Sequence, residues 1–395
     1  MEYNFSISPR IISHLGEELI KNESIALLEL VKNSYDACAT KCIIEFNTDQ
    51  NGDLESIIIE DDGRGMDQDL IKTVWLTIGT DNKFKSKGVN ECGRFPLGEK
   101  GIGRLGIHKL GNRIEMYSKQ SNSNETKVEI DWTALNNVLK IKDFKILIEE
   151  NDHPEQISND KGTKIIINKL KTSWDRRQIR EVHRNLISLN SPFSHSNDVF
   201  NVEVKSNSDL FHAMPNFDDI EDNAMYKGYC KMVGNKIVEF KYDFKPWENL
   251  EKVDTGRHKT LNELLEAELL IVDSIGNEVD LETMGIGPIE FEIQIFETDN
   301  QIFSFSNVEK KSVRDYLREN GGVRVYRDNV RVFDYGERDD DWLGIDIRRV
   351  KRLGGNVSNN IIIGAVKLNR EQSVNLREKT NREGLVRLMR ASNCA

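Results

Sequence analysis

The sequence predicts an α+β protein of two domains. Apolar residues recur at intervals of three and four between Pro9 and Ala39, as in helices, whereas short β-branched runs separated by turn residues dominate the segments that follow. At 395 residues the chain is longer than one ordinary core requires. The polar, irregular stretch 206–222 separates two such patterns, so we assign residues 1–210 to a first domain and residues 211–395 to a second.

The first domain is expected to be a two-layer α/β sandwich. Its apolar spacing predicts two helices within residues 9–39, broken near residues 22–24. The runs 42–46 and 56–59 flank turn residues and predict an antiparallel pair of strands. The remaining expected elements are a helix at 69–77, a mobile loop at 79–98, a helix at 104–110, strands at 113–117, 127–130 and 162–168, a helix at 174–189 and a strand at 199–204. Helices on one side of a largely antiparallel sheet give the two layers.

The second domain is expected to be another α/β unit with its own core. Residues 229–233 and 237–242 flank Gly234-Asn235 and predict a hairpin. The other expected elements are a strand at 289–296, a helix at 313–319, strands at 323–326 and 361–368, and a C-terminal helix after Asn381.

Cysteine usage and hydropathy predict a cytoplasmic protein. The five cysteines lack the spacing of a disulfide framework or a zinc site, so we interpret them as reduced thiols: Cys38, Cys42, Cys92, Cys230 and Cys394. The N-terminus has no basic leader, and no segment approaches the roughly 18 apolar residues that span a bilayer. We therefore expect neither secretion nor a membrane partner.

The net charge of −11 argues against broad, charge-driven binding to nucleic acid. One local basic cluster, Arg348 to Arg352, is compatible with a binding patch, although a solvated surface explains it more simply.

Three polar residues share one face of a predicted helix. Glu29, Asn33 and Asp36 are spaced at i, i+4 and i+7, which places them in a single stripe. A solvated face would account for the two acids, but asparagine is a poor helix former. A ligand such as hydrated magnesium explains its position better.

A carboxylate and two glycines follow a predicted strand. Asp61 stands at the strand end, where pockets open, and Gly63 and Gly65 allow close backbone approach. A simple Asp-Gly turn is the alternative interpretation. A buried carboxylate here could accept a hydrogen bond from an exocyclic amine such as that of adenine.

A glycine run, Gly98 to Gly106, precedes the predicted helix at 104–110. Backbone N–H groups at a helix N-terminus are a ready phosphate site, although a flexible glycine loop is an equally good account of the segment alone. The spacing fits neither the Walker pattern nor a dinucleotide fingerprint.

In this order, the three segments resemble the GHKL ATPase superfamily, which includes gyrase B, MutL, MORC proteins, histidine kinases and the heat-shock-protein-ninety chaperones. Glu29, Asn33 and Asp36 resemble its N box, residues 61–66 its first glycine box and residues 98–103 its second. Gly162-Thr163 resembles its last adenine-side element. The resemblance implies the Bergerat ATP-binding fold, with ATP and Mg²⁺ as cofactors.

The resemblance also implies a role for each matched residue. Glu29 would be the general base, Asn33 the magnesium ligand, and Asp61 the reader of adenine, supported through water by Thr163. The residues counted with the nucleotide site are Asn33, Asp36, Asp61, Gly63, Gly65, Met66, Gly98, Lys100, Gly101, Ile102, Gly103 and Thr163. Residues 79–98 would be the ATP lid.

The second half resembles, more weakly, the ribosomal-S5-domain-2-like transducer domain that follows this ATPase in several relatives. Such domains return one basic residue to the γ-phosphate. The segment 381–385 is similar to the one that carries this residue in the chaperones, so Arg382 is the candidate, with Lys379 as the substitute. A surface arginine at a helix start is the alternative.

We expect a magnesium-dependent ATPase whose ATP binding closes the lid and promotes an N-terminal homodimer. The rival hypothesis is a nucleotide-gated module that recruits a DNA or protein client with little turnover. Histidine-kinase-like phosphotransfer is a weaker third, because kinases normally lack the acid at the Glu29 position, and His14 is better explained as a surface helix residue.

Overall fold

The computed structural model divides the chain into two compact units. Unit 1 comprises Met1–Ile187 with Ser196–Ala213, and unit 2 comprises Ser188–His195 with Met214–Ala395. The structure describes residues 8–12, 14, 20, 22–77, 88–97, 106–153, 156–193, 200–207, 211, 214, 216–247, 250, 269–273, 276–306, 309–333, 335–338, 340–351, 357–378 and 384–387.

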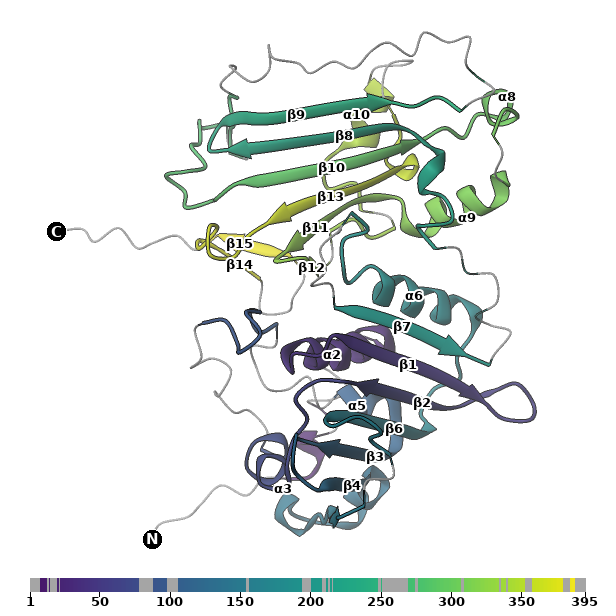
Figure 1. Cartoon of the computed structure of the whole chain (residues 1–395), viewed down its shortest axis with the longest axis vertical. Helices are drawn as coiled ribbons and strands as arrows, with labels where there is room; N and C mark the ends of the chain where they lie inside the picture. Colours follow the sequence, from purple (N-terminus) through teal and green to yellow (C-terminus); the bar gives the residue numbers. More distant parts are fainter. Residues whose placement is uncertain are drawn as a thin grey trace, which may run out of the picture. The chain divides into compact units, whose positions relative to one another are not determined.

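A seven-stranded sheet forms one layer of unit 1, in the order β5-β4-β3-β6-β2-β1-β7 (Figure 1). Its strands are β1 (Lys41–Thr48), β2 (Leu54–Asp61), β3 (Gly111–Lys119), β4 (Glu125–Asp131), β5 (Leu147–Asn151), β6 (Gly162–Leu170) and β7 (Asn201–Ser206). Neighbours pair antiparallel except β7, which pairs parallel with β1. The predicted 42–46/56–59 pair is confirmed, whereas β5 was not predicted.

Helices form the second layer of unit 1 (Figure 1). They are α2 (Glu23–Asp36), α5 (Gly106–Leu110) and α6 (Arg176–Ile187). The Asn22 side chain caps α2 by accepting a hydrogen bond from the Ile25 N–H at 2.9 Å. Gly106 at the start of α5 faces Ala26 of α2, since a Cβ built on Gly106 would lie 3.4 Å from the Ala26 Cα. The α/β sandwich expected from the sequence is therefore present.

The predicted helix at 69–77 is shorter and less regular than expected. It consists of α3 (Gln68–Leu70) followed by a π-helical turn, η1 (Ile71–Trp75). The 3₁₀ turns of unit 1 are η3 (Trp132–Asn137) and η4 (Ile141–Asp143).

Unit 2 is built on a six-stranded sheet in the order β12-β11-β13-β10-β8-β9. Its strands are β8 (Ala224–Val233), β9 (Lys236–Phe244), β10 (Ile289–Phe296), β11 (Gly322–Arg327), β12 (Val330–Val332) and β13 (Ile362–Leu368). Its helices are α8 (Asn300–Phe303), α9 (Lys310–Asn320) and α10 (Ile345–Lys351), with 3₁₀ turns η6 (Glu221–Asn223) and η8 (Asn359–Ile361). Val313, Tyr316 and Leu317 of α9 pack into a buried cluster that includes Tyr326 and Ile363 of the sheet. The predicted second core and α+β class are confirmed.

The C-terminal helix predicted after Asn381 is wrong within the described residues. Leu385–Arg387 is strand β15, which pairs antiparallel with β14 (Leu376–Glu378). Backbone pairing with β14 thus overrides the helical spacing that the local sequence suggested.

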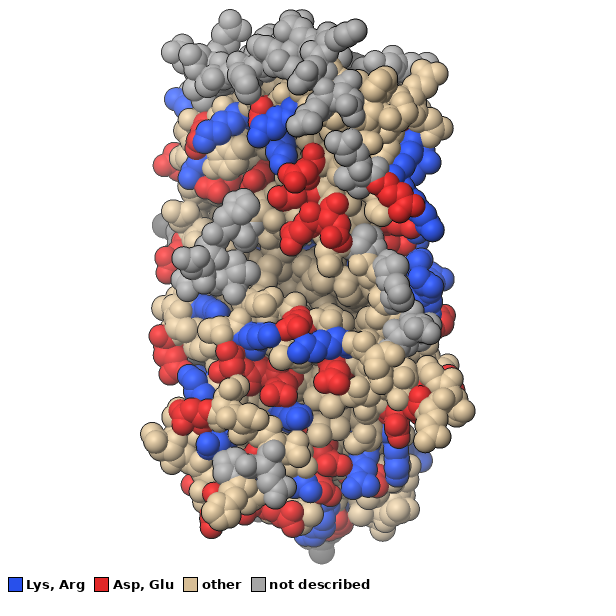
Figure 2. Space-filling view, turned by 45° about the vertical axis from the view of Figure 1, so that its right-hand side comes forward, with Lys and Arg blue, Asp and Glu red and all other residues tan. Residues whose placement is uncertain are grey.

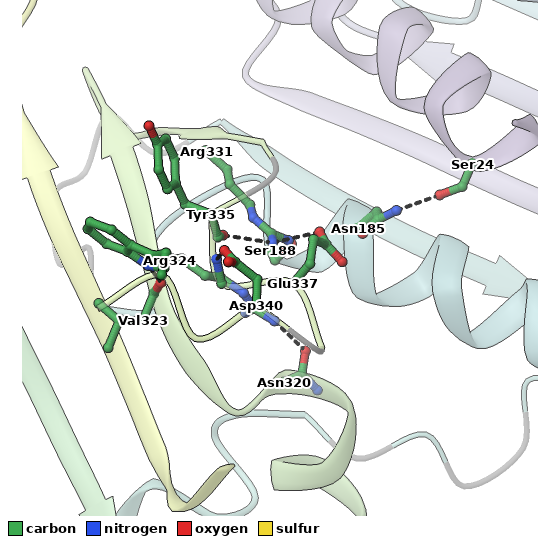
Figure 3. Close-up of polar contacts among 12 residues, drawn as sticks. Ser24, Asn185, Ser188, Asn320, Val323, Arg324, Arg331, Tyr335, Glu337 and Asp340 are labelled. Carbon is green, nitrogen blue, oxygen red and sulfur yellow. Dashed lines mark hydrogen bonds and ion pairs between the residues drawn. The ribbon is translucent and has the colours of Figure 1, made fainter. Parts of the chain in front are cut away.

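The buried Arg331 hydrogen-bonds the start of the segment 188–195 to strand β12 of unit 2. Arg331 of β12 donates through Nη1 to the Ser188 Oγ at 2.7 Å, and its Nη2 lies 2.7 Å from the Glu337 Oε1 (Figure 3). Its backbone N–H donates to the Leu189 carbonyl at 2.9 Å. These contacts explain why the segment belongs to unit 2 although it directly follows α6.

No helix in the described part of the chain is long and apolar enough to cross a membrane.

Candidate functional site

A cavity of about 190 Å³ lies in unit 1 beside helix α2. Leu30, Asn33, Ser34 and Ala37 contribute to its wall, and their spacing of three and four places them on one face of the helix. This volume is below the roughly 300–1,000 Å³ of pockets that enclose a whole drug-sized ligand. We therefore expect the cavity to take one end of a ligand.

Most of the cavity wall is apolar. The sheet supplies Ile59, Met116 and Ile165, the α3–η1 segment supplies Leu70, Val74 and Trp75, and α5 supplies Ile107. Such a surface suits a flat ring or another apolar group, with the few polar side chains fixing its orientation.

Asp61 supplies a carboxylate to this apolar wall. The end of β2 positions it, and its Oδ2 accepts a hydrogen bond from the Ser34 Oγ at 2.8 Å. Its Oδ1 accepts from the Gly63 N–H at 2.9 Å. Burial raises the pKa of Asp61 from 3.8 to about 6, and the hydrogen bonds from Ser34 and Gly63 oppose the rise. The carboxylate is fixed by two donors and still borders the cavity.

The glycines after Asp61 are required by their surroundings. Gly65 has φ +67°, and a Cβ there would lie 1.8 Å from the Lys119 carbonyl oxygen. A Cβ on Gly63 would lie 2.8 Å from the Ala37 carbonyl oxygen. The turn therefore passes too close to its neighbours for any side chain at these two positions.

Thr163 lies directly opposite Asp61 in the pairing of β2 with β6, and it also lines the cavity. Its hydroxyl is 2.8 Å from the Ser118 Oγ, and either can donate. Ser118 also accepts from the Met66 N–H at 2.9 Å. A connected polar edge therefore borders the cavity beside Asp61.

Asn33 and Asp36 line the cavity, whereas Glu29 lies one helical turn earlier and outside the described wall. The Glu29 side chain is buried, and its Oε1 lies 3.5 Å from the Lys32 Nζ, which is also buried. Among the described residues no group of three His, Cys, Asp or Glu could hold a metal ion. The Asn33 side-chain oxygen could serve as one ligand of a magnesium ion, which usually keeps several waters and takes further oxygens from bound phosphates.

Several predicted site residues lie outside the described part of the chain. They are Gly98, Lys100, Gly101, Ile102 and Gly103 of the glycine run, and Lys379 and Arg382 of the C-terminal segment. The predicted roles of these residues stay predictions.

The prediction of reduced cysteines is wrong for one pair. Cys38 and Cys92 form a disulfide with a Cα–Cα distance of 5.9 Å. The two residues are 54 positions apart, and the path of residues 88–97 across the end of α2 brings them together. Cys42 and Cys230 are free, whereas Cys394 lies outside the described residues.

The segment that builds this cavity also matches a known family. Residues 21–163 match the family described as histidine kinase-, DNA gyrase B-, and HSP90-like ATPase. This segment belongs to the GHKL ATPase superfamily. The GHKL segment contains α2, the Asp61 turn and Thr163, so the superfamily predicted from the sequence is confirmed.

A curated protein also matches part of this chain. It is the putative type II restriction enzyme HgiDII of Herpetosiphon aurantiacus, which is 31% identical over 175 residues. The match covers 43% of this chain and 26% of that protein, so the chain spans about a quarter of its relative.

A solved structure was also matched, the ATPase domain of the bacterial mismatch repair endonuclease MutL of Aquifex aeolicus. The match covers 88% of this chain and 90% of that one, at 11% identity and a TM-score of 0.40.

The sequence motifs did not reveal Ser34 and Ser118. Both are small hydroxyl residues at buried positions, and each hydrogen-bonds a site residue named above. Ser34 directly follows Asn33 on α2, so its place beside a predicted site residue could have marked it as a candidate. The cross-sheet contact of Ser118 depends on strand register.

Proposed function

We propose that this chain binds ATP with Mg²⁺ and hydrolyses it. The observation that carries the proposal is the Asp61 carboxylate, held by Ser34 and Gly63 at the edge of an otherwise apolar cavity. An adenine ring fits such a wall, and its exocyclic amine would donate to the Asp61 carboxylate. Thr163, opposite Asp61, is close enough to share a water with the base.

The remaining roles follow the order of residues along α2. Asn33 would hold Mg²⁺, which neutralises phosphate charge when bound. Glu29 would accept a proton from the attacking water, and the N–H groups of residues 98–103 would bind phosphate oxygens. Phosphoryl transfer depends more on positioning and charge neutralisation than on covalent chemistry, and these residue types provide both.

The same proposal includes a nucleotide-dependent clamp. ATP would close the lid over the site, Arg382 or Lys379 would reach the γ-phosphate, and two chains would associate through their N-terminal domains. Support comes from the family of the GHKL segment and from the basic residues of the segment 379–382.

Steady-state ATP turnover with matched variants tests the enzyme. Glu29→Ala should abolish hydrolysis while ATP binding remains, and Asn33→Ala should lose hydrolysis through weaker magnesium-dependent binding. The controls are Glu149→Ala and Asn136→Ala, because both side chains are exposed in unit 1 away from the cavity. Unchanged turnover in both site variants would refute the proposed mechanism.

A nucleotide-gated module with little turnover is the second candidate. Arg348 and Arg349 of α10 are exposed, and the matched relative is a putative restriction enzyme, so the client to test first is duplex DNA. Elsewhere, on the face shown in Figure 2, acidic and basic side chains are interspersed rather than separated by sign. This face therefore offers no continuous basic stripe to support the candidate.

Light scattering with and without a non-hydrolysable ATP analogue, then with DNA at two salt concentrations, separates the candidates. A clamp becomes a dimer with the analogue, and a DNA module binds DNA less tightly at high salt. A nucleotide-independent monomer that ignores DNA would refute both the clamp and the DNA version. Transfer of the γ-phosphate from labelled ATP to the protein would instead favour the histidine-kinase reading.

A further inference from the structure

The segment 88–97 is docked on the C-terminal end of helix α2. The Leu97 N–H donates to the Asp36 Oδ1 at 2.6 Å, and the Asn90 side chain donates to the Asp36 carbonyl at 3.3 Å. Asp36 also lines the cavity. Any displacement of this segment therefore removes hydrogen bonds from a residue of the nucleotide site.

Arg94 strengthens the docking. Its Nη1 donates to the Ala39 carbonyl at 2.6 Å, and its guanidinium lies 4.7 Å from the centre of the Tyr35 ring. The Ala39 carbonyl lies just beyond the C-cap of α2, and the ring contact is a cation–π interaction. The segment thus contacts Tyr35, Asp36 and Ala39 at the end of α2.

The Cys38–Cys92 disulfide makes this docking covalent. Cys38 has φ +61° directly after α2, at the position where helices usually end with glycine. An L-residue is disfavoured there relative to glycine, so the backbone does not explain this cysteine. Its bond to the segment 88–97 does.

The Cys38–Cys92 disulfide is more accessible to an external thiol than the free cysteines Cys42 and Cys230 are. Cys92 is exposed, so a dithiol can reach its sulfur. Cys42 is fully buried, and burial raises the pKa of its thiol and of the half-buried Cys230. Among the described cysteines, we therefore expect thiol–disulfide exchange chiefly at Cys38 and Cys92.

We propose that Cys38 and Cys92 form a thiol–disulfide switch that sets the nucleotide affinity of the cavity, an inference that rests on the proposed ATP site. In the oxidised form the segment 88–97 is already ordered against Asp36, so ATP does not have to order it on binding. In the reduced form ATP binding must order it, and affinity falls.

A dithiol can reduce the Cys38–Cys92 bond, and glutathione disulfide can form it again. A dithiol breaks the S–S bond by supplying two electrons and two protons, which leaves two cysteine thiols, and it closes to its own disulfide. Glutathione disulfide reverses the step and leaves as two molecules of glutathione.

The test compares both redox forms of the full chain. The protein is treated with dithiothreitol or glutathione disulfide, the Cys38–Cys92 peptide is assayed by mass spectrometry without reduction, and binding of a non-hydrolysable ATP analogue with Mg²⁺ is measured by calorimetry. The reduced form should bind roughly tenfold more weakly, the effect of ordering a few side chains on binding. Cys92→Ser should bind weakly under both conditions, and the control Cys230→Ser should switch like the unmodified chain.

The outcomes separate the switch from the site. Equal affinity of the two forms, a redox response that survives in Cys92→Ser, or no cross-linked peptide after oxidation would overturn the switch and leave the ATP site in place. If neither form binds the analogue, the ATP site is refuted, and the switch fails with it. Because Cys92 is exposed, its serine variant should fold, and Cys38→Ser provides an independent second break of the same bond.

Discussion

Replacing Asp61 by asparagine should stabilise unit 1 at neutral pH while abolishing nucleotide binding. The difference between the ordinary pKa of 3.8 and the raised pKa of about 6 corresponds to about 3 kcal/mol at 1.36 kcal/mol per pH unit. This value is an upper limit, because Asp61 borders the cavity and is only partly buried. A carboxamide can still accept from the Gly63 N–H and donate to the Ser34 Oγ, so Asp61→Asn removes the charge without breaking the turn.

The sign of the effect follows from proton binding. Between pH 3.8 and about 6 the folded state holds the Asp61 proton more tightly than the unfolded state, so this group favours folding most at low pH. Its contribution is lost as the pH rises through 6. The stability advantage of Asp61→Asn should therefore grow from about 0.5 kcal/mol at pH 4 to at most about 3 kcal/mol at pH 7.5.

Urea unfolding at several pH values measures this advantage. Hydrogen–deuterium exchange of peptides from β2 reads the transition of unit 1 separately from that of unit 2, which a whole-chain signal would mix. Asp143→Asn, at an exposed position of the same unit, is the matched control. A stability difference that is independent of pH, or that grows as the pH falls, would refute the reasoning.

Two further substitutions test other parts of the structure. Gly65→Ala should destabilise unit 1 by more than about 3 kcal/mol, because it adds a clash with the Lys119 carbonyl to the cost of the left-handed backbone. Gly52→Ala, with φ +87° and no atom within 4 Å of its Cβ, should cost only about 1–2 kcal/mol, and equal losses in the two urea titrations would contradict the close approach at Gly65. Arg331→Met should destabilise unit 2 by about 1.5–3 kcal/mol because it removes the hydrogen bonds that a buried guanidinium donates to the Ser188 Oγ and the Glu337 carboxylate, and an unchanged thermal unfolding midpoint would show that these contacts are dispensable.

Periodicity predicted the elements that carry the site. Glu29, Asn33 and Asp36 lie on helix α2, and Asp61 is the last residue of strand β2, as predicted. Both elements could be predicted because a regular apolar face and a β-branched run are local properties of the chain. The matched family explains why these motifs occur together.

Features that depend on contacts between distant chain segments could not be predicted from local sequence patterns. The Cys38–Cys92 bond joins residues with no recognisable spacing. The contact between Ser118 and Thr163 is set by strand register. The strand 385–387 exists because it pairs with β14, and local spacing had favoured a helix there.

The parallel pairing of β7 with β1 limits where unit 1 can be truncated. Residues 201–206 cover the outer edge of residues 41–46, although the family match ends at residue 163. A fragment that stops at residue 163 would lose nearly all of β6, which lies between β3 and β2, and it would also leave the edge of β1 unpaired. Unpaired strand edges promote aggregation. A nascent chain likewise leaves this edge unprotected until residue 206 has been synthesised. The smallest fragment expected to fold as unit 1 is therefore considerably longer than the segment that matches the family.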